Sequence, residues 1–301
     1  MSRQMVIQDE NDAFHSHGND DEQQVVVVPP SWLLDICHRL ERNDPLLIHL
    51  NLNIRRMQNS VWVSYLWKAL QSNHLLQTLN LTSCLSYLSL RDRIILPTAH
   101  GLSTLHLSYN CISDCTLLAN SLKSKSTSSL QRLFLDYNHI SDDTGGIELA
   151  NALRYCNSTL QELQLGSNRL GDRTALAMAD MLTYNTSLRV LNLPANQISL
   201  KGIQGIEKSL EESNVTLTTC HLERNPRWET DTTTKNQKLG TILEWNRCGR
   251  YCLRRTTSTG SEEGDAFWSF LLSRIKSTSV MYLMLRSKPE LMKYNQQIPA
   301  P

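Results

Sequence analysis

The chain has 301 residues, enough to bury a large hydrophobic core in one large domain or two ordinary ones. Its 30 Lys and Arg balance 29 Asp and Glu, whereas a dedicated nucleic-acid-binding protein normally has a strong basic excess. No stretch is apolar over the roughly 18 residues that a membrane-spanning helix needs. Neither nucleic acid nor a membrane is therefore expected as a partner.

Residues 1–24 are expected to form a disordered acidic tail, because they carry six acidic residues and only one basic residue. The first residues, MSRQMVIQDENDAF, lack the apolar run of a secretory signal, so a cytoplasmic location is expected, with the nucleus as the alternative. Thiols stay reduced in both compartments. The eight cysteines are therefore not interpreted as a disulfide framework.

Residues 25–45 are predicted to cap the N-terminal end of the fold with a strand and a helix. The strand is expected at 25–28, and the helix from Ser31 to about Arg42. Trp32, Ile36 and Leu40 stand at helical spacing and are expected to face inward. A cap is needed because the first coil of the repeats that follow would otherwise expose leucine.

From residue 46 to 228 the chain repeats the frame L-x-x-L-x-L-x-x-N-x-I about every 28 residues. All three leucine positions hold leucine in every window except for Cys220. The ninth position is asparagine in five windows, with Arg55 and Cys84 in the first two. Internal similarity at this period is typical of a solenoid of stacked coils. The seven windows begin at Leu47, Leu76, Leu102, Leu130, Leu160, Leu188 and Leu217.

Positions four and six differ by two, so their side chains fall on one face of a short strand, as Leu191 and Leu193 would. Each buried leucine contributes roughly 1.5–3 kcal/mol. Between the windows the apolar period changes to that of a helix. Helices about 10 Å wide beside strands about 4.8 Å apart make the stack curve with its sheet inside. The expected inward faces are Trp62, Tyr65, Leu66 and Ala69, then Gly146, Leu149, Ala150 and Leu153, and then Ala175, Met178, Ala179 and Leu182.

Polar residues at the turns have predicted structural roles. The position-nine asparagine can satisfy backbone groups of its own coil and of the next one. Asp114, Asp142 and Asp172 precede helical segments and are expected to cap them. A second set of asparagines stands three residues before a window, where each is expected to end a helix in the left-handed conformation. These residues are Asn73, Asn157, Asn185 and Asn214.

Three further segments complete the chain. The link between the second and third windows holds Pro97 and is expected to be irregular. Residues 229–255 are predicted to form a C-terminal capping helix, with the basic cluster RCGRYCLRR as a solvated face rather than a phosphate site. Residues 256–301 are interpreted as a linker and a helical tail. The tail is expected to pack onto the solenoid, with docking to a membrane or a partner as the alternative.

Over residues 46–228 the chain resembles the ribonuclease-inhibitor-like leucine-rich repeat family. The resemblance implies an α/β horseshoe solenoid with a curved parallel sheet on its concave face and helices on its convex face. It also implies a recognition module. A ribonuclease partner is disfavoured, because the positions that face away from the core hold only Asp136, Glu162 and Glu223 as acids.

No catalytic motif is present in the sequence: G-x-x-x-x-G-K-[ST], H-E-x-x-H and G-x-S-x-G are all missing. An enzyme is therefore not expected, and neither is a cofactor. The C-x-x-x-C pairs Cys111/Cys115 and Cys248/Cys252 lack the second pair that would close a metal site, so no metal is expected.

The candidate partner-binding site lies on the concave face. Its centre is Phe134, which occupies position five, where a polar residue is expected. Aromatic and arginine residues that cluster in this way are typical of an interface hot spot. Cross-strand stacking without any partner is the alternative. The other residues of the predicted site are Tyr109, Arg132, Asp136, Tyr137 and Glu162.

The leading hypothesis is a non-enzymatic protein–protein interaction scaffold that binds a partner of unknown identity on the concave face. A second hypothesis, also from the family resemblance, is a Ran-type GTPase-activating protein acting on a small GTPase. Such proteins usually carry an acidic tail after the repeats, whereas residues 245–301 carry nine basic and four acidic residues here. A third is the recognition arm of an innate-immune-type sensor.

Overall fold

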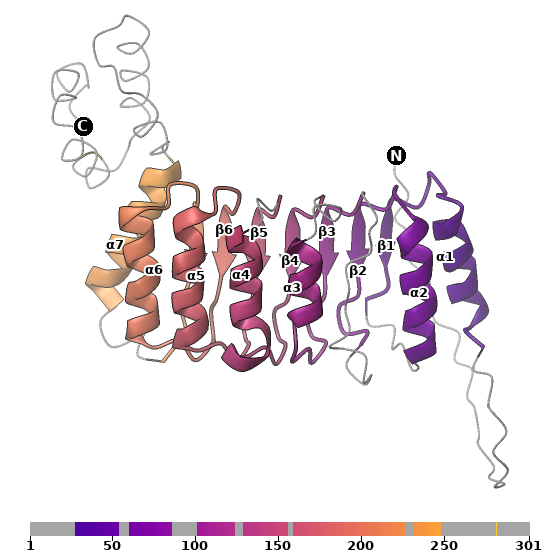
Figure 1. Cartoon of the computed structure of the whole chain (residues 1–301), viewed down its shortest axis with the longest axis horizontal. Coiled ribbons are helices and arrows are strands. Elements are labelled where there is room, and N and C mark those ends of the chain that lie inside the picture. Colours follow the sequence, from indigo (N-terminus) through magenta and orange to yellow (C-terminus); the bar gives the residue numbers. More distant parts are fainter. Residues whose placement is uncertain are drawn as a thin grey trace, which may run out of the picture.

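Figure 1 shows the computed structural model, which describes residues 28–53, 60–85, 101–123, 129–155, 159–226, 232–247 and 281. Seven short parallel strands stand side by side in chain order, and helices cover one face of the sheet. The strands are β1 (His49–Asn51), β2 (Thr78–Asn80), β3 (Thr104–His106), β4 (Arg132–Phe134), β5 (Glu162–Gln164), β6 (Val190–Asn192) and β7 (Thr219–His221). The helices are α1 (Ser31–Glu41), α2 (Ser60–Ser72), α3 (Thr116–Lys123), α4 (Ile147–Tyr155), α5 (Asp172–Tyr184), α6 (Leu200–Glu212) and α7 (Thr232–Arg247).

The leucine frame aligns the strands in register. Position four of each window pairs with position four of the next, so Leu163 lies beside Leu191. Leu165 and Leu193, at position six, are fully buried between the sheet and the helices. The predicted leucine-rich repeat solenoid is thereby confirmed, with the sheet on its concave side. The aligned core row is Leu50, Leu79, Leu105, Leu133, Leu163, Leu191 and Cys220.

The predicted inward faces of α4 and α5 are buried, but that of α2 differs. Leu66 and Ala69 are buried as expected, whereas Tyr65 is 45% exposed and Trp62 is only half-buried. Val63 takes a core position instead. The buried face of α2 thus runs through Val63, Leu66 and Ala69, and the bulkier Trp62 and Tyr65 lie nearer to solvent.

The asparagines at position nine form a ladder of amides. The Asn168 Nδ2 group donates to the carbonyl of Leu165 in its own coil and to that of Leu135 in the preceding coil, each at 3.0 Å. Its Oδ1 atom accepts from the Ile140 amide, also in the preceding coil. The ladder was predicted, but it reaches backward rather than forward along the chain. Cys84 fills the same position, and its thiol donates to the Leu52 carbonyl.

The second set of asparagines does not adopt the left-handed conformation that was predicted. Asn185 has φ −74° and ψ 127°, which is extended backbone. Its Oδ1 atom accepts from the amide of Leu188, and its Nδ2 group donates to the Leu153 carbonyl one coil earlier. Asn73 and Asn214 make matching contacts, whereas Asn157 lies outside the described residues. These asparagines therefore fix the return to the strand by hydrogen bonding rather than by backbone conformation.

Most of the left-handed residues stand at position eight of the frame instead, and Asn43 and Cys111 are the other two non-glycine residues with positive φ in the described ranges. In each of the six windows whose position eight is described, that residue has φ between 52° and 61°. None is glycine, so a turn of this shape costs roughly 1–2 kcal/mol at each residue, which the packed coils must offset. The six residues are Ser83, Tyr109, Tyr137, Ser167, Ala195 and Arg224.

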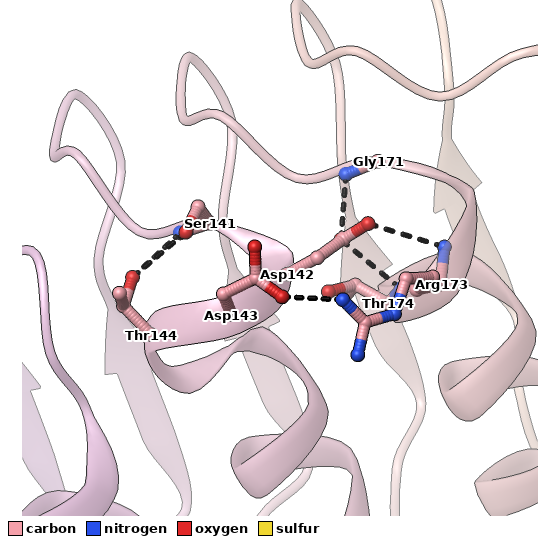
Figure 2. A network of polar contacts seen from close by, with 7 residues as sticks. All are labelled: Ser141, Asp142, Asp143, Thr144, Gly171, Arg173 and Thr174. Carbon is pink, nitrogen blue, oxygen red and sulfur yellow. Dashed lines mark hydrogen bonds and ion pairs between the residues drawn. The ribbon is translucent and has the colours of Figure 1, made fainter.

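Of the three predicted helix caps, only Asp114 acts on the helix that follows it, where its Oδ1 atom accepts from the Thr116 amide at 2.7 Å. Asp142 begins a π-helical turn, η2 (Asp142–Gly146), and its carboxylate instead accepts from the amides at the start of α5, one coil later (Figure 2). Asp172 likewise accepts from the amide and hydroxyl of Ser199, the residue that precedes α6. Because adjacent coils are close-packed, these carboxylates tie one coil to the next.

Several predictions fall on residues that the structure does not describe. These are the acidic tail 1–24, most of the strand at 25–28, most of the link around Pro97, Cys248 and Cys252, and the tail 256–301 apart from Met281. At the two ends, α1 and α7 lie within the predicted capping segments 25–45 and 229–255. Ile36 and Leu40 of α1 are fully buried, and Trp32 packs partly buried against the core.

Candidate protein-binding surface on the sheet face

Two stacked ring pairs lie at the centre of the sheet face. His106 at the end of β3 stacks on Phe134 at the end of β4, with ring centroids 4.3 Å apart and planes 11° apart. Three residues further along each coil, Tyr109 stacks on Tyr137 at 4.2 Å and 8°. We call these four residues the aromatic patch. Stacking in the regular register of the coils fixes the rings without a partner.

The patch remains open to solvent despite this stacking. Tyr109 is 48% exposed and Tyr137 is 51% exposed, while Phe134 and His106 are half-buried. Both tyrosines occupy the left-handed position eight, and their amides donate to the Asp136 and Gly166 carbonyls of the next coil. The coil stack therefore holds both tyrosine backbones in place, so that little conformational entropy remains to be lost when a partner binds.

Charged side chains flank the aromatic patch. Arg132 is exposed, and its Nε group donates to the Thr104 hydroxyl on β3 at 3.2 Å. Glu162 on β5 lies opposite Arg132 in the strand register. Its Oε1 atom accepts a hydrogen bond from the side-chain amide of Gln164 on its own strand. Gln164 in turn accepts from the Asn192 amide on β6 at 2.7 Å. A polar row thus runs across β5 and β6, beside the rings on β3 and β4.

The pKa values of two groups follow from this arrangement. Burial raises the pKa of Asp136, and the charge of Glu162 adds to that rise, although the Gly166 amide donates to Asp136 Oδ1 and opposes it. Burial lowers the pKa of His106, and the charge of Arg132 lowers it further. A neutral imidazole at pH 7 is consistent with its close stacking on Phe134.

All six residues of the predicted site lie within three adjacent coils. Arg132 and Phe134 belong to β4, and Glu162 belongs to β5, while Tyr109, Asp136 and Tyr137 follow their strands at the same edge of the sheet. His106, Gln164 and Asn192 were not predicted as part of the site. All three occupy position five, in register with Phe134, and that spacing could have found them.

The structure gives no sign of a metal centre within the residues that it describes, since no group of three or more His, Cys, Asp or Glu side chains there could hold an ion. Cys111 and Cys115 are free thiols. No helix in the described ranges is both long and apolar enough to cross a membrane.

Comparison with known proteins identifies the repeats. A family described as "Leucine Rich repeat" matches residues 156–179 and 184–206. Tropomodulin-4 from Bos taurus and from Homo sapiens are each 35% identical over 97 residues, which is 32% of this chain and 27% of either protein. NACHT, LRR and PYD domains-containing protein 12 from Mus musculus is 33% identical over 110 residues, or 36% of this chain and 10% of that protein. The chain thus spans about a quarter, or less, of the length of these curated relatives.

Two solved structures are also similar. Leiomodin-1 actin-binding site 2 has a TM-score of 0.36 at 16% identity, covering 75% of this chain and 95% of that one. The tropomodulin C-terminal domain of Caenorhabditis elegans has a TM-score of 0.33 at 14% identity, covering 74% and 97%. The repeat family is identified by the matched repeats, by the seven strands in register and by the amide ladder, and not by these two likenesses. From these observations, the chain is a leucine-rich repeat protein.

Proposed function

We propose that this leucine-rich repeat protein is a non-enzymatic binding module that holds a protein partner on its sheet face, around the aromatic patch. The observation that carries the proposal is the pair of stacked tyrosines, Tyr109 and Tyr137, each about half exposed in the turns that follow the neighbouring strands β3 and β4. Tyrosine and arginine dominate the energetics of protein interfaces, and Arg132 stands exposed on β4, the strand that also carries Phe134.

Stacking on each other leaves much of the surface of both tyrosines uncovered. A stacked pair covers one face of each ring, and Tyr137 still retains 51% of its accessible surface. Such rings, held in place before binding, offer a partner apolar area at little entropic cost. The solenoid adds an extended and rigid surface, which suits a macromolecule better than a small ligand.

The curated relatives match this chain over only about a third of its length, so their partners are candidates for testing. The name of the leiomodin-1 segment includes actin binding, and actin is therefore one protein to include. The relatives reported above give no support for a small GTPase as the partner, and the GTPase-activating alternative is not carried further. The likeness to the NACHT and PYD domain protein extends over a tenth of that protein and adds no partner.

The test is affinity capture from a cell lysate with the immobilised full chain, run beside the double variant Phe134→Ala/Tyr137→Ala. Purified actin is offered in a parallel sedimentation assay. The matched control is Tyr65→Ala, which removes an exposed tyrosine from α2 on the helix side of the sheet. We expect at least one protein to be retained by the wild type and the control, and to be lost with the double variant.

Truncation of a ring that is a hot spot of the interface weakens binding by about 2 kcal/mol or more, which is about thirtyfold. If every captured protein is retained equally by the double variant, the aromatic patch is not the binding surface. Loss of the same proteins with Tyr65→Ala would move the site to the helices. Circular dichroism of the three proteins establishes that each variant is folded.

A further inference from the structure

The hydrogen-bond pattern of the sheet stops at the outer edge of β1. At each of the six junctions between neighbouring strands, the amides at positions two and three donate to the position-two carbonyl of the preceding coil. Gln77 and Thr78, for example, donate to the Ile48 carbonyl at 2.8 and 3.2 Å. The position-five carbonyl accepts from the position-six amide of the preceding coil. In the first coil the equivalent groups are the amides of Ile48 and His49 and the carbonyl of Asn51.

These three groups have no partner within the described part of the chain, where β1 is the first strand of the sheet. His49 is exposed, and Ile48 and Asn51 are half-buried. The strand contains no lysine, acidic residue or proline, which are the residues that commonly keep an open edge from pairing with another strand. The edge of β1 thus offers two donors and one acceptor to a further strand.

The helix layer continues further than the sheet at this end. Helix α1 packs against α2, and Figure 1 shows the two side by side at the N-terminal end of the helix layer. Each later helix follows a strand of its own coil, whereas α1 follows none among the described residues. The coil that contains α1 is therefore the one coil of the described stack that has a helix without a strand before it.

Two exposed apolar side chains flank this coil. Leu46 is 79% exposed and Val28 is 66% exposed, more than any other large apolar or aromatic side chain in the described ranges. Helix α1 has 11 residues and is about 16 Å long. Its C-terminal end leads through residues 42–48 into β1, so Leu46 lies at the start of β1 and Val28 at the opposite end of α1. A strand that ran parallel to β1 from one to the other would cover both side chains.

We propose that residues 24–27 of this chain pair with the outer edge of β1 as a further parallel strand. Three of these four residues are valine, and Val28 follows them, so the segment favours extended structure. Pro29 and Pro30 come next, lack amide donors and end the strand. From Val28 to Ser31 an extended chain spans about 10 Å, the diameter of a helix, and can therefore cross from the sheet to the helix layer.

The segment is favoured over a strand from another chain because it is tethered to α1. A short tether holds it at an effective concentration that is roughly millimolar. Once paired, it would occupy the edge that could otherwise join a second copy of the chain. The inference does not depend on the proposed function, since the aromatic patch belongs to the coils of β3 and β4.

Hydrogen exchange followed by nuclear magnetic resonance tests the pairing in the isotopically labelled full chain. The outward amides, Ile48 and His49, would donate to the added strand. We expect both to exchange at least about a hundredfold more slowly than in an unstructured peptide. Their protection should not change on tenfold dilution, because the segment and the edge belong to one chain. The amides of Gln77 and Thr78, which donate to the Ile48 carbonyl from the other side, are the internal reference for a folded sheet.

The variant Val25→Pro/Val26→Pro removes two consecutive amides, so it blocks the pairing whichever of them faces β1. We expect the two outward amides to lose at least tenfold of their protection, while the two reference amides stay protected. The matched control, Asn11→Pro/Asp12→Pro, makes the same change earlier in the chain and should leave all four amides as in the wild type.

Three results would overturn the added strand. Fast exchange of the outward amides in the wild type would show that the edge is open to solvent. Equal protection in the wild type and in Val25→Pro/Val26→Pro would mean that something other than residues 24–27 covers the edge. Protection that falls on dilution would assign the edge to a second copy of the chain.

Discussion

The carboxylate of Asp142 accepts a hydrogen bond from the amide of Gly171 at 2.8 Å, across the boundary between two coils. Helix α5 begins at the next residue, and Gly171 has no side chain with which to cap it. The two oxygens of Asp142 also accept from the amides of Thr174 and Arg173 (Figure 2). A residue of one coil thus satisfies the first turn of the helix in the following coil, as a capping side chain does within a single helix.

This contact predicts a loss of stability on substitution of Asp142→Ala. Three amides at the start of α5 would lose their acceptor, and removal of a helix cap typically costs about 1–2 kcal/mol. Urea unfolding measures the change. The control is Asp143→Ala, since Asp143 forms an exposed ion pair with Arg173 and such pairs contribute at most about 1 kcal/mol. Equal losses in the two variants would contradict the cap.

The same contact predicts a dependence on pH. Burial alone would raise the pKa of Asp142, but its contacts with Thr174 and with the amides of Gly171 and Arg173 hold that pKa below the ordinary value. The folded state therefore favours the charged carboxylate. Its contribution is fully present above the unfolded pKa of about 3.9 and is lost as the pH falls through the lower folded pKa.

The measurement compares the free energy of unfolding of the wild type and Asp142→Asn at several pH values from 7 to 3. We expect the advantage of the wild type to be constant down to about pH 4 and then to shrink. An advantage that stays constant to pH 3 would show that the charge of Asp142 does not contribute.

The core could be predicted from sequence, whereas the contacts between coils could not. Leu163 and Leu191 are alike in type and in frame position, and an apolar side chain needs only to reach the core, so periodicity suffices to pair them. Asp142 and Asp172 stand beside their own helices in sequence. Which coil their carboxylates reach depends on the offset between neighbouring coils, and no single repeat encodes that offset.

The binding surface could likewise be predicted from the sequence only in part. Phe134 could be singled out because its residue type conflicts with its frame position. Its stacking on His106 depends on the rotamers of both rings, which the sequence does not encode. The left-handed backbone of Tyr109 and Tyr137 had no glycine or asparagine to signal it, because the turn geometry of the stack imposes it on any residue at position eight.

The amide ladder predicts a large effect for Asn168→Ala. The change would leave the carbonyls of Leu135 and Leu165 and the amide of Ile140 without their partner in the interior. Because each unpaired buried group costs about 1–3 kcal/mol, we expect a loss of at least about 2 kcal/mol in urea unfolding. Asn120→Ala, on the exposed side of α3, is the control and should change stability by less than about 0.5 kcal/mol. If Asn168→Ala lowers the free energy of unfolding no more than the control does, the amide ladder does not stabilise the fold.

Replacement of two glycines by alanine is predicted to change the stability of the fold in opposite directions. Gly145 has φ 144° within the turn η2, and a Cβ atom there would lie 2.6 Å from the Cys115 amide nitrogen. Gly145→Ala therefore combines backbone strain with a clash against main chain, and we expect it to cost about 2 kcal/mol or more. Gly240 lies within α7, with nothing within 4 Å of a Cβ atom, so Gly240→Ala should stabilise the chain by about 0.5–1 kcal/mol. Thermal unfolding of both variants measures the two changes in stability. Changes in the same direction would contradict the prediction and would mean that the turn at Gly145 relaxes or that α7 does not unfold with the repeats.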